Sequence, residues 1–504
     1  MRASSAVNPV MRNSTCTTLP GFCMRARKAN TAPRPGVLAD QALSRAAGAT
    51  LIPGNQVHLL KNAQENYPAW IHAIKSAKRW IHFEAYIIHE DDTGRLFAGL
   101  LAAKAREGVK VRLIYDWWGS IGNASGGFFR RLARAGVEVR CFNPLRIDSP
   151  FGWVSRDHRK MISVDGRIAY VTGLCVGQRW LGTPKRDGNS LDAWRDTGIE
   201  IQGPALAEIE RAFAETWTFA GGALLPEELP ATDSIGVAGN VGLRVVATAP
   251  NTAGLYRTDL LVAALARQSL WLADAYFLGT SSYVQALRSA AKSGVDVRLL
   301  IPGATDIPPM RALSRAGLRP LLEAGVRIWE WNGSMMHAKT AVADTHWARV
   351  GSTNLNLASW VGNWELDVVV EDESFAQQME DAYLDDLLHS TEIVLDGKHP
   401  RPVLVGTRPR DLRSRLKRGS AGQTAARIVR LSHTLGAAIT NHRELGPAER
   451  VIMYWGAALL ALLAAVAANW PRAVAFPIAF LCAWIAVSLL VRAIKLHREI
   501  KRQP

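Results

Sequence analysis

The chain has 504 residues, a formal net charge of +16 and 48% apolar residues, which suits a folded protein of several domains with a large core. The basic excess lies at the two ends, because residues 51–400 hold 36 basic and 39 acidic side chains. A middle region without excess positive charge argues against a protein that wraps nucleic acid. The five cysteines are scattered and odd in number, which indicates a reducing compartment and no disulfide framework.

Residues 1–50 are predicted to be a disordered basic N-terminus. They contain seven Lys and Arg residues and one acid, Asp40. Residues 1–36 are rich in Ser, Thr, Arg and Pro and have no apolar stretch of the kind found in signal peptides.

Residues 51–400 contain a repeated unit in which an amphipathic helix ends at a glycine and a strand follows. The unit occurs in the first half as "LLAAKAREGVKVRLIYD" and in the second as "ALRSAAKSGVDVRLLIPG". The halves also match in order, since "IHFEAYIIHEDD" resembles "LWLADAYFLGTS". We therefore predict two duplicated α/β sandwich halves packed as a pseudo-dimer, at 51–225 and 240–400, joined by a linker at 226–239.

The C-terminal region changes composition. We predict a basic juxtamembrane segment at 401–450, two transmembrane helices within 451–491 and a basic tail at 492–504. The two helices correspond to uncharged runs at 451–468 and 473–490, each near the minimum length for a bilayer. Basic residues flank the hairpin on both sides, which favours the cytoplasmic side for both ends and for the catalytic part. A buried helical pair of a soluble domain is the alternative.

Each half ends in the same spaced set of polar residues. His158, Lys160 and Asp165 stand in "DHRKMISVDGRIAYVTG", and their counterparts stand in "MMHAKTAVADTHWARVGSTNLN". A single set of this spacing is weak, but two sets at matching places in two matching halves are strong. The counterparts are His337, Lys339 and Asp344.

The spacing suits a phosphodiester site. Residues i and i+2 of a strand face the same way, so each His and its Lys are predicted to project together. Two such strands meeting across a pseudo-twofold axis bring two imidazoles and two ammonium groups to one point. The lysines offset phosphoryl charge, one imidazole attacks phosphorus and the other protonates the leaving alcohol.

These paired motifs resemble the phospholipase D superfamily. Over residues 55–395 the blocks are similar to bacterial cardiolipin synthases, above all the B type. The resemblance implies phospholipase D-like halves and a metal-independent, cofactor-free transfer through a phosphohistidine. One phosphatidylglycerol gives up glycerol, and the hydroxyl of a second takes the phosphatidyl group. It implies anionic phospholipids (phosphatidylglycerol, cardiolipin) and a membrane as partners, at the cytoplasmic face of the bacterial inner membrane.

The resemblance also assigns roles to single residues. It implies that His158 is the nucleophile and His337 the general acid and later base, although symmetry leaves the swapped assignment open. The lysines, Ser352 and Asn354 match phosphate ligands. Asp165 and Asp344 match the motif carboxylates, which we expect to be structural because they stand at the far end of the strand from each histidine.

Each histidine also needs a carboxylate that fixes its tautomer. Asp196 in "AWRDTGIEI" and Glu365 in "NWELDVVV" stand at matching positions after the two motifs and are the predicted supporting carboxylates. His82, His89 and His346 lack metal-ligand partners and are expected to be structural, and no metal site is predicted.

The chain departs from the family pattern in its first motif. Cys175 stands where the family has Asn, and Thr172 replaces a Gly, so the first half is predicted to hold phosphate more weakly or to prefer another substrate. Just before His158, Phe151 and Trp153 lie among polar loop residues and are predicted to form part of a lipid-facing mouth.

Four functions remain open from the sequence. The leading one is a membrane-bound cardiolipin synthase, and the second is a phospholipase D that uses water as acceptor and yields phosphatidic acid. The third, a phosphodiesterase or nuclease with the same motifs, is disfavoured by the slightly acidic middle region. The fourth is a non-enzymatic membrane protein with a decayed site, for which only Cys175 speaks.

Overall fold

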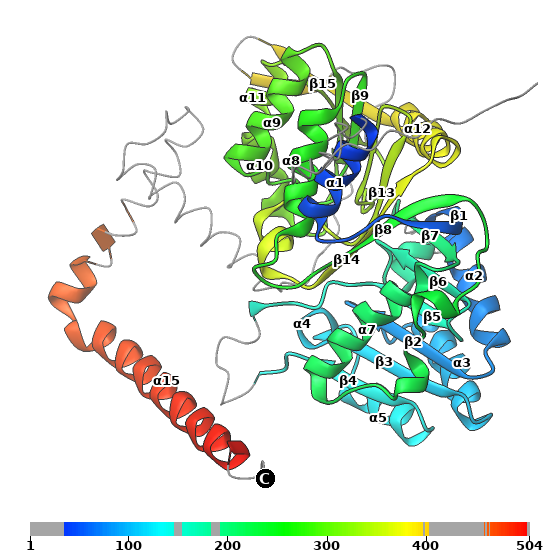
Figure 1. Ribbon diagram of the computed structural model, residues 1–504. Coiled ribbons are helices and arrows are strands. Elements are labelled where there is room, and N and C mark those ends of the chain that lie inside the picture. The colour runs from blue at the N-terminus through cyan, green and yellow to red at the C-terminus, as the bar shows by residue number, and fades with distance from the viewer. Residues whose placement is uncertain are drawn as a thin grey trace, which may run out of the picture.

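The computed structural model describes residues 35–145, 154–182, 192–396 and 399–402, together with 458, 461–462 and 464–500. Sixteen strands of these residues form one continuous sheet (Figure 1). The strands of the first half are β1 (Ile52–Lys61), β2 (Trp80–Ala85), β3 (Lys110–Asp116), β4 (Glu138–Phe142), β5 (Met161–Val164), β6 (Ile168–Thr172) and β7 (Thr197–Gln202). Those of the second half are β8 (Val241–Thr248), β9 (Ser269–Ala273), β10 (Asp296–Pro302), β11 (Arg327–Trp331), β12 (Thr340–Ala343), β13 (Trp347–Gly351), β14 (Glu365–Glu371), β15 (Ser390–Asp396) and β16 (His399–Pro402).

The strand order confirms the duplication. The first half runs β1-β7-β6-β5-β2-β3-β4, and the second repeats it as β8-β14-β13-β12-β9-β10-β11. Each half contains three neighbouring parallel strands, β2–β3–β4 in the first and β9–β10–β11 in the second, and the motif strands β5 and β12 pair antiparallel with β2 and β9. In the second half, the antiparallel strands β15 and β16 extend the outer edge beyond β11. The two half-sheets join where β1 pairs antiparallel with β8.

Helices complete both halves. The first half contains α2 (Asn62–Ser76), α3 (Asp92–Arg106), α4 (Trp117–Ser120), α5 (Gly126–Arg134), α6 (Gln178–Leu181) and α7 (Leu206–Gly221). The second contains α8 (Gly254–Leu265), α9 (Ser281–Lys292), α10 (Pro308–Ala316), α11 (Arg319–Leu322), a π-helical turn (Ala358–Gly362) and α12 (Glu373–Leu388). The repeated helix–glycine–strand unit is confirmed at α3–β3 and α9–β10, where Gly108 and Gly294 adopt φ +87° and +94°.

Three apolar clusters hold these layers together. One lies in each half, and the third is shared, because it combines strands of both halves with α7 and α12. Successive strand residues face opposite sides of the sheet. Met161 of β5 therefore joins the shared cluster, and Ile162 joins the cluster of the first half. The shared cluster fixes the two halves against each other.

Part of the N-terminal segment predicted to be disordered is helical. Residues 35–47 form α1 (Pro35–Ala47), which packs against α8. Ala47 is buried in the cluster of the second half, Arg244 pairs with Asp40, and Arg257 donates to the carbonyl of Ala46 (3.1 Å). The apolar side chains that this helix buries against the second half explain the difference from the composition-based prediction. Residues 1–34 lie outside the described residues.

Residues 471–500 form α15 (Pro471–Ile500), which contains the second predicted span. Of the helices in the described residues, none meets the length and hydropathy that a membrane crossing requires. Most of the first predicted span lies outside the described residues, so the transmembrane hairpin stays a prediction.

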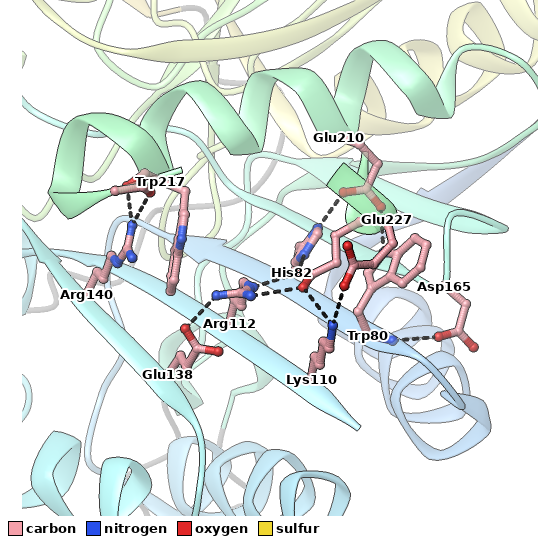
Figure 2. Close-up of polar contacts among 12 residues, drawn as sticks. Trp80, His82, Lys110, Arg112, Glu138, Arg140, Asp165, Glu210, Trp217 and Glu227 are labelled. Carbon is pink, nitrogen blue, oxygen red and sulfur yellow. Dashed lines mark hydrogen bonds and ion pairs between the residues drawn. The ribbon is translucent and has the colours of Figure 1, made fainter. Parts of the chain in front are cut away.

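A buried ionic cluster attaches the linker to the first half (Figure 2). His82 on β2 contacts Glu210 of α7 through Nδ1 (2.5 Å) and Glu228 of the linker through Nε2 (3.1 Å). Arg112 donates to both carboxylate oxygens of Glu228 (2.6 and 2.9 Å) and to Glu138. Burial raises the pKa of Glu228, but the hydrogen bonds from Arg112 and His82 outweigh it and lower that pKa to about 2. His82 therefore has the structural role expected of it.

Removing the Glu228 charge is expected to destabilise the protein, because Arg112 and His82 would stay buried with an incomplete set of partners. We expect Glu228→Gln to lower the free energy of unfolding by about 3 kcal/mol. The neighbouring Glu227→Gln removes only an exposed pair with Lys110 and is expected to cost less than about 1 kcal/mol. Urea denaturation of both variants measures the difference, and equal stabilities would show that the linker is not anchored in this way.

Candidate active site

The two histidine segments do not lie within the strands that follow them. The strands β5 and β12 begin one residue after Lys160 and Lys339. The prediction that each histidine and its lysine lie within the strand is therefore wrong. The reason is that each segment pairs with the other half instead. The backbone N–H of His158 donates to the backbone carbonyl of Trp364 (2.8 Å), and the backbone N–H of His337 donates to the backbone carbonyl of Arg195 (2.7 Å).

The imidazole of His158 is paired with a carboxylate of the second half. Its Nδ1 lies 2.9 and 3.1 Å from the two oxygens of Glu365, the first residue of β14. The hydroxyl of Ser352 donates to Glu365 Oε2 (2.6 Å). Both Glu365 and Ser352 are fully buried, so the carboxylate can turn little away from the histidine.

The imidazole of His337 is paired with a carboxylate of the first half. Its Nδ1 lies 2.6 Å from Asp196 Oδ2, which also accepts from the indole N–H of Trp180 (3.1 Å). The other oxygen, Oδ1, accepts from the backbone N–H of Thr197 (2.9 Å). A Cβ at Gly173 would lie 2.1 Å from Oδ1, so only glycine leaves room for this carboxylate.

The supporting pairs therefore cross between the halves. Asp196 and Glu365 are brought to the histidines as the sequence suggested, but each serves the histidine of the opposite half. A carboxylate on Nδ1 makes that nitrogen the donor and leaves Nε2 as the nitrogen free for chemistry. Neither half alone contains both members of a motif histidine–carboxylate pair.

The two lysines lie beside the histidines. Lys160 Nζ donates to the backbone carbonyl of His158 (2.6 Å), and Lys339 Nζ donates to that of His337. Burial lowers the pKa of Lys339 to about 8, with repulsion from Lys160 acting in the same direction and attraction to Asp196 opposing it. Two buried ammonium groups at one point make a site that an anion would stabilise.

The same charges act on the histidines. Burial and the Lys339 ammonium lower the pKa of His337 to about 3, against the opposing effect of Asp196. The pKa of His158 is also lowered, first by burial, although Glu365 raises it. Both imidazoles are therefore neutral near pH 7 when the site holds no anion. An arriving phosphodiester offsets the lysines and raises both histidine pKa values.

The two motif aspartates, Asp165 and Asp344, directly follow β5 and β12, at the opposite end of each strand from the histidine. Asp165 accepts from the backbone N–H groups of Lys78, Arg79 and Trp80 (2.7–2.9 Å). Asp344 accepts in the same way from residues 267–269 (2.8–2.9 Å). Both aspartates adopt positive φ, +56° and +50°, in the tight turn after the strand. This geometry supports a structural role for both.

The residues predicted to hold phosphate differ in their surroundings. The Ser352 hydroxyl donates to Glu365 and accepts from the backbone N–H of Leu366, so it positions the Glu365 carboxylate. Asn354 is 4% exposed, and its Oδ1 has no hydrogen-bond partner among the described residues. Cys175 occupies the matching place of the first half and is buried. Burial raises the pKa of its thiol, and the nearby Lys160 lowers it.

Aromatic residues around the histidines were not predicted. The rings of Tyr86 and Tyr276 lie 4.8 and 6.2 Å from those of His158 and His337, edge to face. Both tyrosines stand in the matching "AY" of the repeated blocks, and this repeat could have indicated that they belong to the site. Trp180 and Trp194 contact the His337 ring. Trp180 stands in "WLG", which the second half repeats as "WVG" at Trp360, whereas Trp194 has no counterpart at the aligned position. Phe151 and Trp153, the predicted lipid-facing residues, lie outside the described residues.

Comparison with known proteins gives consistent matches. Residues 70–217 and 262–387 match the family model described as cardiolipin synthase, PLD-like domain. The chain is 32% identical to a cardiolipin synthase of Alkalihalophilus pseudofirmus over 343 residues, 67% of each chain. It is 33% identical to cardiolipin synthase A of Pseudomonas fluorescens over 352 residues, 68% of this chain and 70% of that one.

One solved structure supports the fold. Phosphatidylserine synthase of Haemophilus influenzae aligns with a TM-score of 0.55 over 79% of this chain and 98% of its own length. At 14% identity this likeness concerns the fold alone.

The structural role of the motif aspartates can be tested by stability. Asp165→Ala removes the acceptor of three backbone N–H groups, so we expect the free energy of unfolding to fall by about 2–4 kcal/mol. Asp344→Ala is expected to behave alike. Urea denaturation of the two variants measures the loss, and a variant with unchanged stability would contradict the structural assignment.

Proposed function

The chain belongs to the cardiolipin synthase family, whose members carry phospholipase D-like domains, and we propose that it makes cardiolipin from two molecules of phosphatidylglycerol. The observation that carries this proposal is the pair of buried histidines, each held through Nδ1 by a carboxylate of the opposite half, beside two buried lysines. Such a site suits a transfer in two steps with one histidine on each side of the phosphorus.

In the first step, His158 Nε2 attacks the phosphorus of the donor lipid. The P–N bond forms as the P–O bond to glycerol breaks. His337, which takes up a second proton on Nε2 once the bound phosphodiester has raised its pKa, gives that proton to the leaving glycerol oxygen. In the second step, His337 takes the proton of the acceptor hydroxyl, whose oxygen attacks phosphorus. The new P–O bond forms as the P–N bond breaks, so the enzyme returns to its starting state.

The choice of His158 as the nucleophile follows the family resemblance, and the swapped roles would use the same geometry. Glu365 and Asp196 stabilise whichever imidazole carries positive charge. Lys160 and Lys339 offset charge on the phosphoryl oxygens, and Asn354 is the proposed amide ligand of the phosphate. Ser352 acts through Glu365, so we assign it to positioning instead of direct phosphate binding.

The proposed partners are anionic phospholipids in the membrane. The apolar runs at 451–468 and 473–490, and the basic residues around them, support an attachment to the cytoplasmic face of the bacterial inner membrane. Basic residues there would also draw anionic head groups towards the enzyme.

A product assay tests the proposal. The full chain, with chelator present, is incubated with vesicles of labelled phosphatidylglycerol, and the lipids are separated. We expect cardiolipin and glycerol, with a loss of about a thousandfold in rate in both His158→Ala and His337→Ala. The matched control is His346→Ala, an exposed histidine in the turn between β12 and β13, which is expected to retain the wild-type rate.

Other products would contradict the proposal. Phosphatidic acid without cardiolipin would identify a phospholipase D with water as acceptor. Full activity in either catalytic histidine variant would show that the two motifs do not form one site.

A further inference from the structure

A group of partly exposed polar side chains lies beside His337. The Tyr276 ring stands edge-on to the imidazole (6.2 Å between centroids), and its hydroxyl donates to Asp306 Oδ1 (2.7 Å). Asp306 follows β10, in the loop before α10. Burial raises the pKa of Asp306, and the hydrogen bond from Tyr276 and the positive charges of Arg179 and Lys339 oppose that rise.

A cation completes the group. Arg179, an exposed residue of α6, places its guanidinium 5.8 Å from the Trp194 ring, which in turn lies 5.3 Å from the His337 ring. The backbone N–H of Trp194 donates to the carbonyl of Arg179 (3.0 Å), which ties the two residues together. Neither Arg179 nor Asp306 has a role in the two proposed transfer steps.

The corresponding positions beside His158 carry no such charges, and the carboxylate and guanidinium found nearby, Asp116 and Arg156, are buried and paired with each other (3.2 Å). The repeat "VRLIYDWWGS" aligns with "VRLLIPGATD", which places Ser120 opposite Asp306. The turn that corresponds to α6 in the second half, Ala358–Gly362, reads "ASWVG" and contains no charged residue. Of these matching positions, the carboxylate and the guanidinium occur only beside His337, although the backbone is duplicated.

This asymmetry matters because the two sides of the phosphorus bind different groups. In the proposed function, His337 protonates the leaving glycerol and later deprotonates the acceptor alcohol, so both occupy its side. A glycerol headgroup offers hydroxyls that a carboxylate accepts. An acceptor phosphatidylglycerol also carries its own phosphodiester anion three carbons from the attacking hydroxyl, and a guanidinium pairs well with such an anion.

We propose that Asp306, Tyr276 and Arg179 form an alcohol subsite that holds the glycerol headgroup of the acceptor lipid, with Arg179 on the acceptor's phosphate. The subsite rests on the proposed function and deepens it, since it gives a lipid alcohol contacts that water lacks. It therefore favours transfer over hydrolysis when the P–N bond of the phosphohistidine breaks. The acceptor proton goes to His337, and the oxygen forms the new P–O bond.

The test separates formation of the phosphoenzyme from its breakdown. The donor is phosphatidyl-p-nitrophenol in vesicles, and release of p-nitrophenol counts each phosphatidyl transfer to the enzyme. The acceptor is phosphatidylglycerol in one series and free glycerol in the other, with water competing in both. The quantity measured is the ratio of the transfer product, cardiolipin or phosphatidylglycerol, to phosphatidic acid. It is compared between the wild-type protein and Arg179→Gln, Asp306→Ala and Asp306→Asn. The control Arg106→Gln changes an exposed arginine at the end of α3.

The two acceptors should distinguish the residues. In Arg179→Gln, the ratio of cardiolipin to phosphatidic acid is expected to fall roughly tenfold, because a charge-assisted contact to the acceptor phosphate is lost. With free glycerol, which has no phosphate, the ratio should stay within about twofold of wild type. Both Asp306 variants should lower the ratio with either acceptor, by roughly fivefold in Asp306→Ala. Asp306→Asn keeps the side-chain volume and guards against a folding defect.

Two outcomes separate the subsite from the proposed function. Wild-type ratios in Arg179→Gln and Asp306→Asn, with cardiolipin still produced, would overturn the subsite alone. Phosphatidic acid as the only product of the wild-type protein, with phosphatidylglycerol present, would overturn the proposed function and the subsite with it.

Discussion

The crossed histidine–carboxylate pairs are the constraint on which the rest of the structure depends. A buried imidazole that must gain and lose a proton needs a fixed partner on its other nitrogen. Here that partner comes from the opposite half, through Glu365 for His158 and Asp196 for His337. The two halves must therefore stay in one relative position to within the tolerance of a hydrogen bond.

Several features of the fold meet that requirement. The β1–β8 pairing makes one sheet of two, and the shared apolar cluster packs α7 and α12 with strands of both halves. The backbone N–H groups of the histidines donate across the same boundary. Glycine at position 173 and serine at position 352 then adapt each side to a carboxylate of different length. The duplicated backbone thus holds two sides whose chemistry differs in detail.

The repeated blocks allowed the sequence to predict the duplicated α/β halves, the two motifs and the two supporting carboxylates. It did not predict which histidine each carboxylate serves, since either pairing fits the spacing along the chain. The contacts of Trp180 and Trp194 with the His337 ring join residues distant in sequence, and α1 depends on a surface of the second half that composition does not describe. The buried contact of Glu228 with Arg112 joins the linker to a strand distant in sequence, so no local pattern pointed to it.

The most direct measurement of the crossed arrangement is the ¹⁵N resonances of the two imidazoles, in protein labelled at histidine and assigned with His158→Gln and His337→Gln. We expect both rings to carry their proton on Nδ1 near neutral pH. We also expect Glu365→Gln to perturb the His158 resonances and Asp196→Asn to perturb the His337 resonances. The reverse pattern, with each carboxylate acting on the histidine of its own half, would contradict the crossed arrangement.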